Sequence, residues 1–489
     1  MLRLWILLSI LLGLSSCGPS SQDGPINIAI MGEPDSLFQQ GVRLSPAAQH
    51  LRSATSEGLV ALDPTGEILP AIAERWIVTD DGQSYIFRLR DSDWPDEQLI
   101  TASDVADLLR ESLQRLEGTS LGLDLAKVTD VRAMTGRVIE IKLSSPMPEF
   151  LRLMAQPELG FVSGGGGTGP MSASREEGAS VLELSAVAPE DRGLPARRDW
   201  EELSKPLTVQ AIPASHAVSA FSSGAVDLLI NGQISSFPSA QLGPLSRGNI
   251  RVDPALGLFG FVIRNDDGVL ATAELREALS MALDRASLIE PFGLTGWASS
   301  RSIVPDELLQ SEQILQVSWA EMSLDERRSI AFNRIRAWEE ESGEDAVLRV
   351  ALPGGAGSDL LLNGIAQNWE AVGVRVVRVA QGEGAELQLR DRLARYSSPR
   401  WFLNQFNCEL ELGLCSEDAD ALVAQSLVSQ DLSEKAQLLA QAHSEMLAQQ
   451  IFIPIGAPVR WSLVRGTIEA FEPNQWGIHP LFPLSSPTI

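Results

Sequence analysis

Two patterns of apolar and polar positions alternate along the chain. Short apolar runs bounded by Gly, Pro, Asp or Asn are typical of strands, and segments whose apolar residues recur every three or four positions are typical of amphipathic helices. Their interleaved order predicts α/β units with parallel strand pairing. The predicted strands include 26–31, 138–143, 181–188, 207–212, 258–264, 347–353, 374–379 and 451–455, and the predicted helices include 147–154, 215–223, 358–371 and 431–450.

Residues 57–116 carry the densest series of local signals. An apolar strand at 57–62 ends in the turn sequence Asp63-Pro64-Thr65-Gly66. The strands 76–79 and 85–90 flank an Asp-Gly step that is typical of a tight hairpin. Thr101 is placed to cap the next helix, with Asp104 three residues later. The apolar face of that helix is formed by Val105, Leu108, Leu109, Leu113 and Leu116.

This order of motifs resembles the extracytoplasmic solute-binding proteins of peptide and nickel ABC importers, family 5. In that family an EGL strand, a D-x-x-G turn, a P-x-(L/I)-A-E-x-W helix, a DG hairpin ending F-x-L-R, a tryptophan-rich turn and a T-A-x-D-V helix follow one another. All six occur here in order, although Trp94-Pro95-Asp96-Glu97 departs from the usual W-S/H-D-G. A second match is Leu275–Arg285, which is similar to the family's V/L-R-x-A-L-x-x-A-I/L-D-R.

The resemblance implies an α/β fold of two lobes, the Venus flytrap of the large peptide-binding type, with an extra small α+β domain. At 489 residues the chain is too long for one core, which agrees with several domains. The expected division is a signal peptide at 1–16, a tether at 17–25, lobe I at 26–55, 160–256 and 471–489, the small domain at 56–159, and lobe II at 257–470.

Composition and motifs argue against several other classes. The formal charge of −26 makes a nucleic-acid partner unexpected. Gly164-x-Gly166-x-x-Gly169 matches a dinucleotide fingerprint in form only, because no apolar helix follows it; the family has a G-T-G-P loop here. No two of the four histidines lie at metal-binding spacing, and no G-x-S-x-G motif occurs. We therefore expect no enzyme activity, no cofactor and no metal.

The N-terminus has the features of an export signal. Leu4–Leu14 is apolar and too short to span a bilayer, and Leu14-Ser15-Ser16-Cys17 resembles a lipobox. We expect cleavage before Cys17 and lipid attachment to it, which would anchor a periplasmic or cell-envelope protein. The alternative is that Cys17 stands beside an ordinary cleavage site.

Cys408 and Cys415 are the other two cysteines. Seven positions apart in an oxidising compartment, they are expected to form a disulfide. Two buried thiols are the alternative.

Candidate ligand-binding residues come from two segments. The resemblance implies that Glu33 and Pro34, which follow the first strand, face the ligand cleft; an exposed turn is the alternative. It also points to Trp401, Phe402 and Asn404: peptide binders have a Trp here and, three residues later, an Asp that pairs with the ligand's ammonium group. Asn404 at that place lacks the charge. The alternative is that these aromatic residues belong to the core.

The expected function is a monomeric binding lipoprotein that captures a peptide-like or other organic solute for an ABC permease and ATPase. A transporter-independent scaffold, chaperone-like or sensory lipoprotein of the same fold is the alternative.

Overall fold

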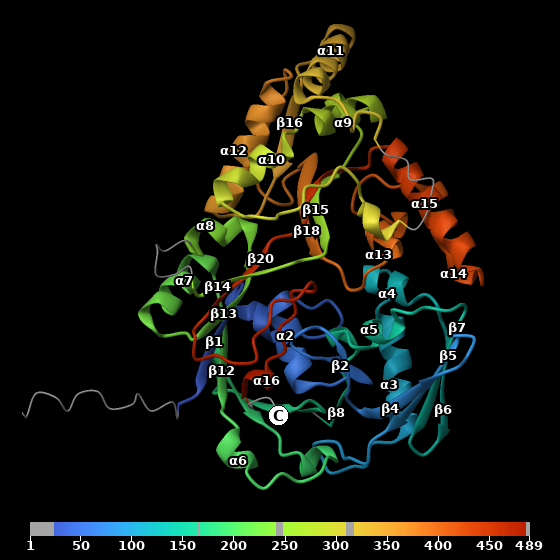
Figure 1. The fold of residues 1–489 in the computed structure, drawn as a ribbon, viewed down its shortest axis with the longest axis vertical. Helices are drawn as coiled ribbons and strands as arrows, with labels where there is room; N and C mark the ends of the chain where they lie inside the picture. Colours follow the sequence, from blue (N-terminus) through green and yellow to red (C-terminus); the bar gives the residue numbers. More distant parts are fainter. Residues whose placement is uncertain (1–23, 165, 241–247, 310–316, 486–489) are drawn as a thin grey trace, which may run out of the picture.

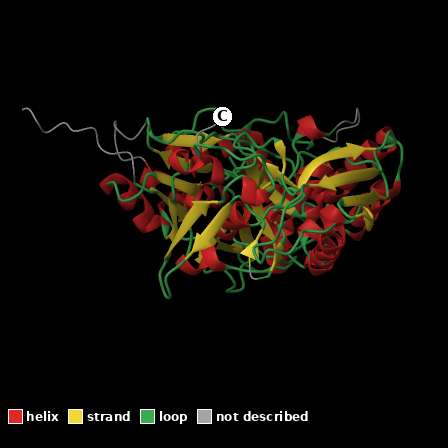
Figure 2. Ribbon diagram, turned by 90° about the horizontal axis from the view of Figure 1, so that it is seen from below, coloured by secondary structure: helices red, strands yellow, loops and turns green. Residues whose placement is uncertain are grey.

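The computed structural model describes residues 24–164, 166–240, 248–309 and 317–485. It is a two-lobed α/β protein built on three main sheets of seven, five and four strands. Figure 1 shows the seven-stranded sheet at the lower left, the five-stranded sheet above it and the four-stranded sheet at the lower right. Figure 2, seen from below, shows the strands of the first and third sheets at opposite sides. The three sheets define the first lobe, the second lobe and the small domain, respectively.

The first lobe is organised around β1 (Ile26–Met31), the fourth strand of its sheet. Ile28 and Ile30 are buried in one hydrophobic cluster and Ala29 and Met31 in another, so both faces of β1 are covered. This explains its continuous apolar run and its parallel pairing with two neighbours. The order is β10 (Met171–Ser174), β11 (Val181–Ala186), β12 (Leu207–Ile212), β1, β13 (Leu228–Gln233), β20 (Arg460–Val464) and β14 (Ile250–Asp253), with helices α2 (Pro46–Thr55), α6 (Trp200–Leu203), α7 (Ala214–Ser223), α8 (Phe237–Ala240) and α16 (Phe482–Ser485).

The second lobe contains the predicted strand–helix–strand unit. β16 (Val347–Ala351) and β17 (Arg375–Val379) pair in parallel, as expected, through α12 (Ala356–Glu370). Thr272 caps α9 (Ala273–Ala282), because its side chain accepts a hydrogen bond from the Leu275 N–H. The other elements are β15 (Gly257–Ile263), β18 (Leu387–Leu393), β19 (Phe452–Gly456), α10 (Arg285–Ile289), α11 (Leu324–Ser342), α13 (Pro399–Asn404), α14 (Glu417–Val428) and α15 (Leu432–Ala448).

The start of α12 lies against the first lobe. A Cβ at Gly357 would stand 1.9 Å from the carbonyl oxygen of Ile234, which follows β13. Only glycine permits such a close approach of two backbones. The two lobes are therefore in direct contact here.

The small domain is an antiparallel sheet covered by helices. Tyr85, Phe87 and Leu89 alternate along β5 and are buried, and the predicted Thr101 cap accepts from the Asp104 N–H. The domain shares one hydrophobic cluster with the second lobe. Its elements are β2 (Val60–Leu62), β3 (Ile68–Pro70), β4 (Ala73–Val78), β5 (Ser84–Leu89), α3 (Ala102–Arg115), α4 (Ser120–Leu125), β6 (Val128–Thr135), β7 (Val138–Leu143), α5 (Phe150–Met154), β8 (Val162–Ser163) and β9 (Gly166–Gly167).

Two sequence-based expectations differ from this structure. The segment expected as a P-x-(L/I)-A-E-x-W helix is instead strand β4, because its residues pair with β5 across the hairpin. The chain also returns to the first lobe earlier than residue 471, since β20 joins the seven-stranded sheet. The lobes are thus connected at 254–256, between β14 and β15, and at 457–459, between β19 and β20.

Candidate functional site

Two adjoining cavities lie where both lobes and the small domain meet. Their volumes are about 520 and about 260 Å³, and they share Leu44, Gln49, Arg392 and Arg395. We call them together the cleft. Its walls come from residues within 42–50 and 476–478 of the first lobe, 118–121 and Glu158 of the small domain, and 390–395, Leu410 and Leu412 of the second lobe.

Strand β18 presents arginines to the cleft because side chains alternate between the faces of a sheet. Leu387 and Leu389 are buried in a hydrophobic cluster that contains residues of both lobes. Arg390 and Arg392 therefore lie on the opposite face, where both line the cleft. Arg395 follows two residues after the end of the strand and lines it too.

The three arginines have few partners. Arg395 pairs with Glu158 at 3.2 Å, and Glu158 also accepts from the Gln49 side chain at 3.0 Å. Arg390 reaches only the Gln405 side chain, at 3.4 Å, and its Nε is buried without a hydrogen bond among the described residues. The Arg392 side chain has no hydrogen-bond or ion-pair partner within the described part of the chain.

The cleft is cationic in a strongly acidic protein. Burial and the neighbouring arginines lower the pKa of Arg392 to about 9 and that of Arg390 to about 10. Both stay charged at neutral pH, but at an electrostatic cost. His50 adds no charge, because burial lowers its pKa to about 4. The lining contains Arg43, Arg152, Arg390, Arg392, Arg395 and Arg460 against the two acids Glu158 and Asp391.

The residues expected to bind ligand on α13 lie elsewhere. Trp401 and Phe402 are 0% exposed and pack edge to face, with ring centroids 4.8 Å apart, in the cluster shared with the small domain. The Asn404 amide donates to Asp124 on α4 at 2.8 Å. None of the three lines the cleft, and α13 joins the second lobe to the small domain.

Asp124 is the centre of that junction. Its Oδ1 also accepts from the Tyr396 hydroxyl at 3.0 Å, and Arg400 donates to its backbone carbonyl at 2.6 Å. Burial raises the pKa of the Asp124 carboxyl to about 6, against the opposing effect of Arg400 and Arg395. Such a network specifies how the two parts dock.

Glu33 and Pro34 stand just after β1 and are exposed. The Glu33 carbonyl accepts from the Ser36 N–H at 2.9 Å, which makes this a turn leading into helix η1 (Pro34–Phe38). Neither residue lines the cleft; Gln39 and residues 42–45 of the same connection do.

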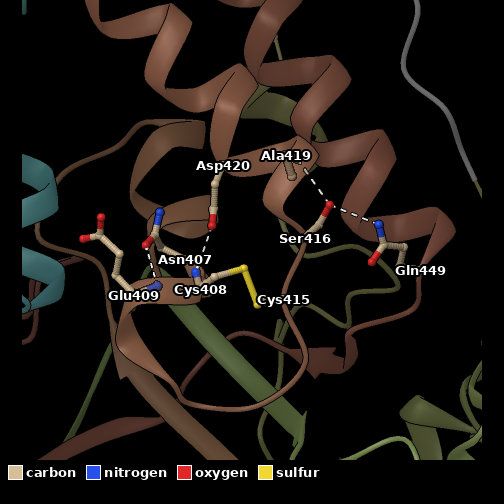
Figure 3. Close-up of a disulfide and its surroundings, with 8 residues drawn as sticks. All are labelled: Asn407, Cys408, Glu409, Cys415, Ser416, Ala419, Asp420 and Gln449. Carbon is tan, nitrogen blue, oxygen red and sulfur yellow. Dashed lines mark hydrogen bonds between the residues drawn. A yellow bond between two sulfur atoms is a disulfide. The ribbon is translucent and has the colours of Figure 1, made fainter.

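Cys408 and Cys415 form a disulfide in the structure, with their Cα atoms 5.3 Å apart (Figure 3). The Asp420 carboxylate accepts from the Cys408 N–H at 2.9 Å and ties the loop to α14. Leu410 and Leu412, inside this loop, form part of the cleft wall.

Another cavity, of about 670 Å³, is lined by the second lobe and by residues next to the lobe connections, such as Ala255 and Gln475. It receives no residue from α2 or the small domain. The cleft, lined by three parts of the molecule, is the better candidate.

Other features of the described residues bear on function. They contain no cluster of three His, Cys, Asp or Glu side chains arranged to hold a metal ion. Across the same ranges, no helix has both the length and the apolar character needed to cross a membrane. The expected signal peptide at 1–16 and Cys17 lie outside the described residues.

A two-lobed α/β fold with a cleft between its lobes defines a class of solute-binding proteins, and the comparisons agree. Residues 67–188 match the model of bacterial extracellular solute-binding proteins, family 5 middle. This match confirms the resemblance seen in the sequence.

Relatives and solved structures extend the match over the chain. The probable deoxycholate-binding periplasmic protein of Escherichia coli is 31% identical over 145 residues, covering 26% of this chain and only 27% of that protein. The periplasmic oligopeptide-binding protein OppA of Salmonella typhimurium is 24% identical over 471 residues, covering 84% and 82%. The structure of Haemophilus influenzae OppA in complex with the peptide RPPGFSPFR has a TM-score of 0.78 at 18% identity, covering 95% and 100%.

Proposed function

We propose that the protein is the extracytoplasmic substrate-binding lipoprotein of an ABC importer. It captures a peptide-like or other organic solute between its lobes and delivers it to a membrane permease and its ATPase. The observation that carries this proposal is the cleft, whose walls come from both lobes and the small domain. Relatives named for oligopeptide binding support the same role.

The connections between the lobes suit capture by closure. Two short segments of chain join the two large sheets. They are 254–256, which connects β14 to β15, and 457–459, which connects β19 to β20. A few residues that absorb a change in backbone angles are sufficient for hinge motion. The bound solute would then stabilise the closed arrangement that a permease recognises.

Anchoring follows from the N-terminal sequence. Cleavage before Cys17 and lipidation of its thiol and amine would hold the protein at the cell envelope, with residues 17–25 as the tether. Within the mature chain we keep the division into two lobes and a small domain given in the sequence analysis, except that the chain returns to the first lobe at β20. In this proposal the solute is released to the permease unchanged.

Differential scanning fluorimetry against a library of peptides, opines, sugars and metal chelates tests the proposal. Ligand at a hundredfold its Kd adds about 2.7 kcal/mol to the free energy of unfolding, which is a clear rise in Tm. We expect at least one class to raise the Tm in proportion to the logarithm of its concentration. A library in which no compound moves the Tm would contradict solute capture and favour a scaffold role.

A further inference from the structure

The cleft has a charge opposite to that of the whole chain. The sequence has 64 acidic and 38 basic residues, yet arginines outnumber acids three to one in the cleft. Long charged side chains on an acidic protein would be expected to find carboxylate partners. Here four of the six, Arg43, Arg152, Arg390 and Arg392, form no ion pair with a carboxylate among the described residues.

Both acids of the cleft lining are already paired with an arginine. Asp391 pairs with Arg460 at 2.7 Å, and Glu158 pairs with Arg395. Arg152 donates to the Gly66 carbonyl at 2.6 Å and lies over the Trp476 ring. Arg43 is exposed to solvent. Apart from Arg152, the partly buried charges without a carboxylate partner among the described residues are therefore those of Arg390 and Arg392, which lie next to each other on one face of β18.

Unpaired, partly buried guanidinium groups destabilise a folded protein. Their mutual repulsion and lost hydration are visible in the lowered pKa values of both groups. Guanidinium groups bind carboxylates and phosphates through paired, charge-assisted hydrogen bonds, so an anion in this position would remove the cost.

We propose that the cleft recognises its solute through an anionic group, a carboxylate or a phosphate, held by Arg390 and Arg392 and flanked by Arg395. This inference rests on the proposed function, because it names the chemical class of the captured solute. A solute whose only charge is an ammonium group is disfavoured at this place.

Matched probes of one size separate the charge classes. Trialanine is offered as N-acetyl-trialanine (one negative charge), as trialanine amide (one positive charge) and as N-acetyl-trialanine amide (neutral); glucose 6-phosphate against glucose separates phosphate from carboxylate. Binding is measured by isothermal titration calorimetry with the full mature protein. We expect the acetylated carboxylate or the sugar phosphate to bind at least tenfold more tightly than its neutral counterpart.

Substitutions of the cleft arginines then test which side chains bind the anionic group. Arg392→Gln is expected to weaken binding of the anionic probe about ten- to hundredfold, the range for one charged hydrogen-bonding partner. Arg392→Lys should recover part of the loss, and Arg390→Gln should act in the same direction. Arg336→Gln, an exposed arginine on α11, is the matched control and should change nothing. Ligand-free Arg392→Gln should melt no lower than the wild type, whereas loss of a structural arginine would lower its Tm.

The outcomes separate the two proposals. Preferential binding of the cationic or neutral probes, or anion binding that survives Arg392→Gln and Arg390→Gln unchanged, overturns the anion site and leaves solute capture standing. Failure of every probe in all charge classes overturns the anion site, and an inert library in the thermal-shift screen would overturn solute capture as well.

Discussion

Arg460 and Asp391 form a buried ion pair that joins the two lobes beside the cleft. The Arg460 guanidinium donates to the Asp391 carboxylate at 2.7 Å, and their side chains are 6% and 10% exposed. Arg460 begins β20 in the first lobe, and Asp391 lies on β18 in the second. Since a connection between the lobes ends at residue 459, the pair fixes their relation close to the hinge.

Removing one partner should cost far more than removing both. Asp391→Ala leaves the Arg460 charge buried with only the Val459 carbonyl as acceptor. We expect a loss of about 3–5 kcal/mol in the free energy of unfolding. The double variant Asp391→Leu/Arg460→Met should recover most of it, because no unpaired charge remains. Urea denaturation measures both.

The control for this pair is Glu340→Ala. Glu340 pairs with Arg336 at 2.9 Å on the exposed surface of α11, where a salt bridge is worth less than about 1 kcal/mol. If Asp391→Ala costs no more than Glu340→Ala, the pair does not hold the lobes together.

Two tryptophans should respond oppositely to truncation. Trp401→Ala removes a fully buried ring from the shared core and is expected to cost about 3–5 kcal/mol of stability, with solute affinity of the folded fraction within threefold of wild type. Trp476 lines the cleft, and Trp476→Ala should reduce affinity. Calorimetry and urea denaturation measure the two effects. If Trp401→Ala leaves the stability unchanged but abolishes solute binding, α13 is part of the binding site.

The sequence predicted the elements of this fold better than the site. Local signals such as the Thr101 and Thr272 caps and the parallel pair around α12 depend on neighbours within a few residues, and all three are confirmed. The position of β20 depends on pairing with β13 more than two hundred residues away, which no local pattern contains.

The candidate cleft differs from the predicted binding residues because aromatic residues are ambiguous in sequence. Trp401 and Phe402 suit a binding surface or a core equally, and only the packing of α13 against α4 decides. The alternation of Leu387 and Leu389 with Arg390 and Arg392 was the available signal. An arginine on a strand is usually solvated, so the pattern alone does not indicate a cleft.

Asp124 should make stability depend on pH between 5 and 7. Its folded pKa of about 6 lies above the ordinary value of 3.8, so the folded state holds a proton that the unfolded state has released. Its contribution is present at low pH and is lost as the pH rises through 6. Wild type should gain about 1 kcal/mol relative to Asp124→Asn between pH 7 and pH 5.

The difference between the two proteins isolates this group. His50 and His443, whose pKa values burial lowers to about 4, act in the opposite direction: their contribution is lost as the pH falls below 6.5. Both histidines are present in wild type and variant, so their effect cancels. Urea denaturation at the two pH values gives the comparison, and an unchanged difference would mean that Asp124 does not titrate in this window.

The Cys408–Cys415 disulfide should stabilise both the loop and the cleft wall. Closing so short a loop is worth about 2–3 kcal/mol in the chain-entropy account. Cys408→Ser/Cys415→Ser should lose this amount and, because Leu410 and Leu412 line the cleft, should also bind solute more weakly. Wild-type protein in which the Cys408–Cys415 disulfide has been reduced should show the same losses of stability and affinity. Equal unfolding midpoints and affinities with and without the bond would contradict the assignment.

Hydrogen–deuterium exchange of the full mature chain, with and without the tightest-binding solute of the thermal-shift screen, tests the central claim most directly. Capture between the lobes predicts slower exchange on binding in three separate segments, residues 42–50, 390–395 and 476–478, since each lines the cleft. Slower exchange confined to one lobe, or found only around the cavity beside Ala255, would contradict it.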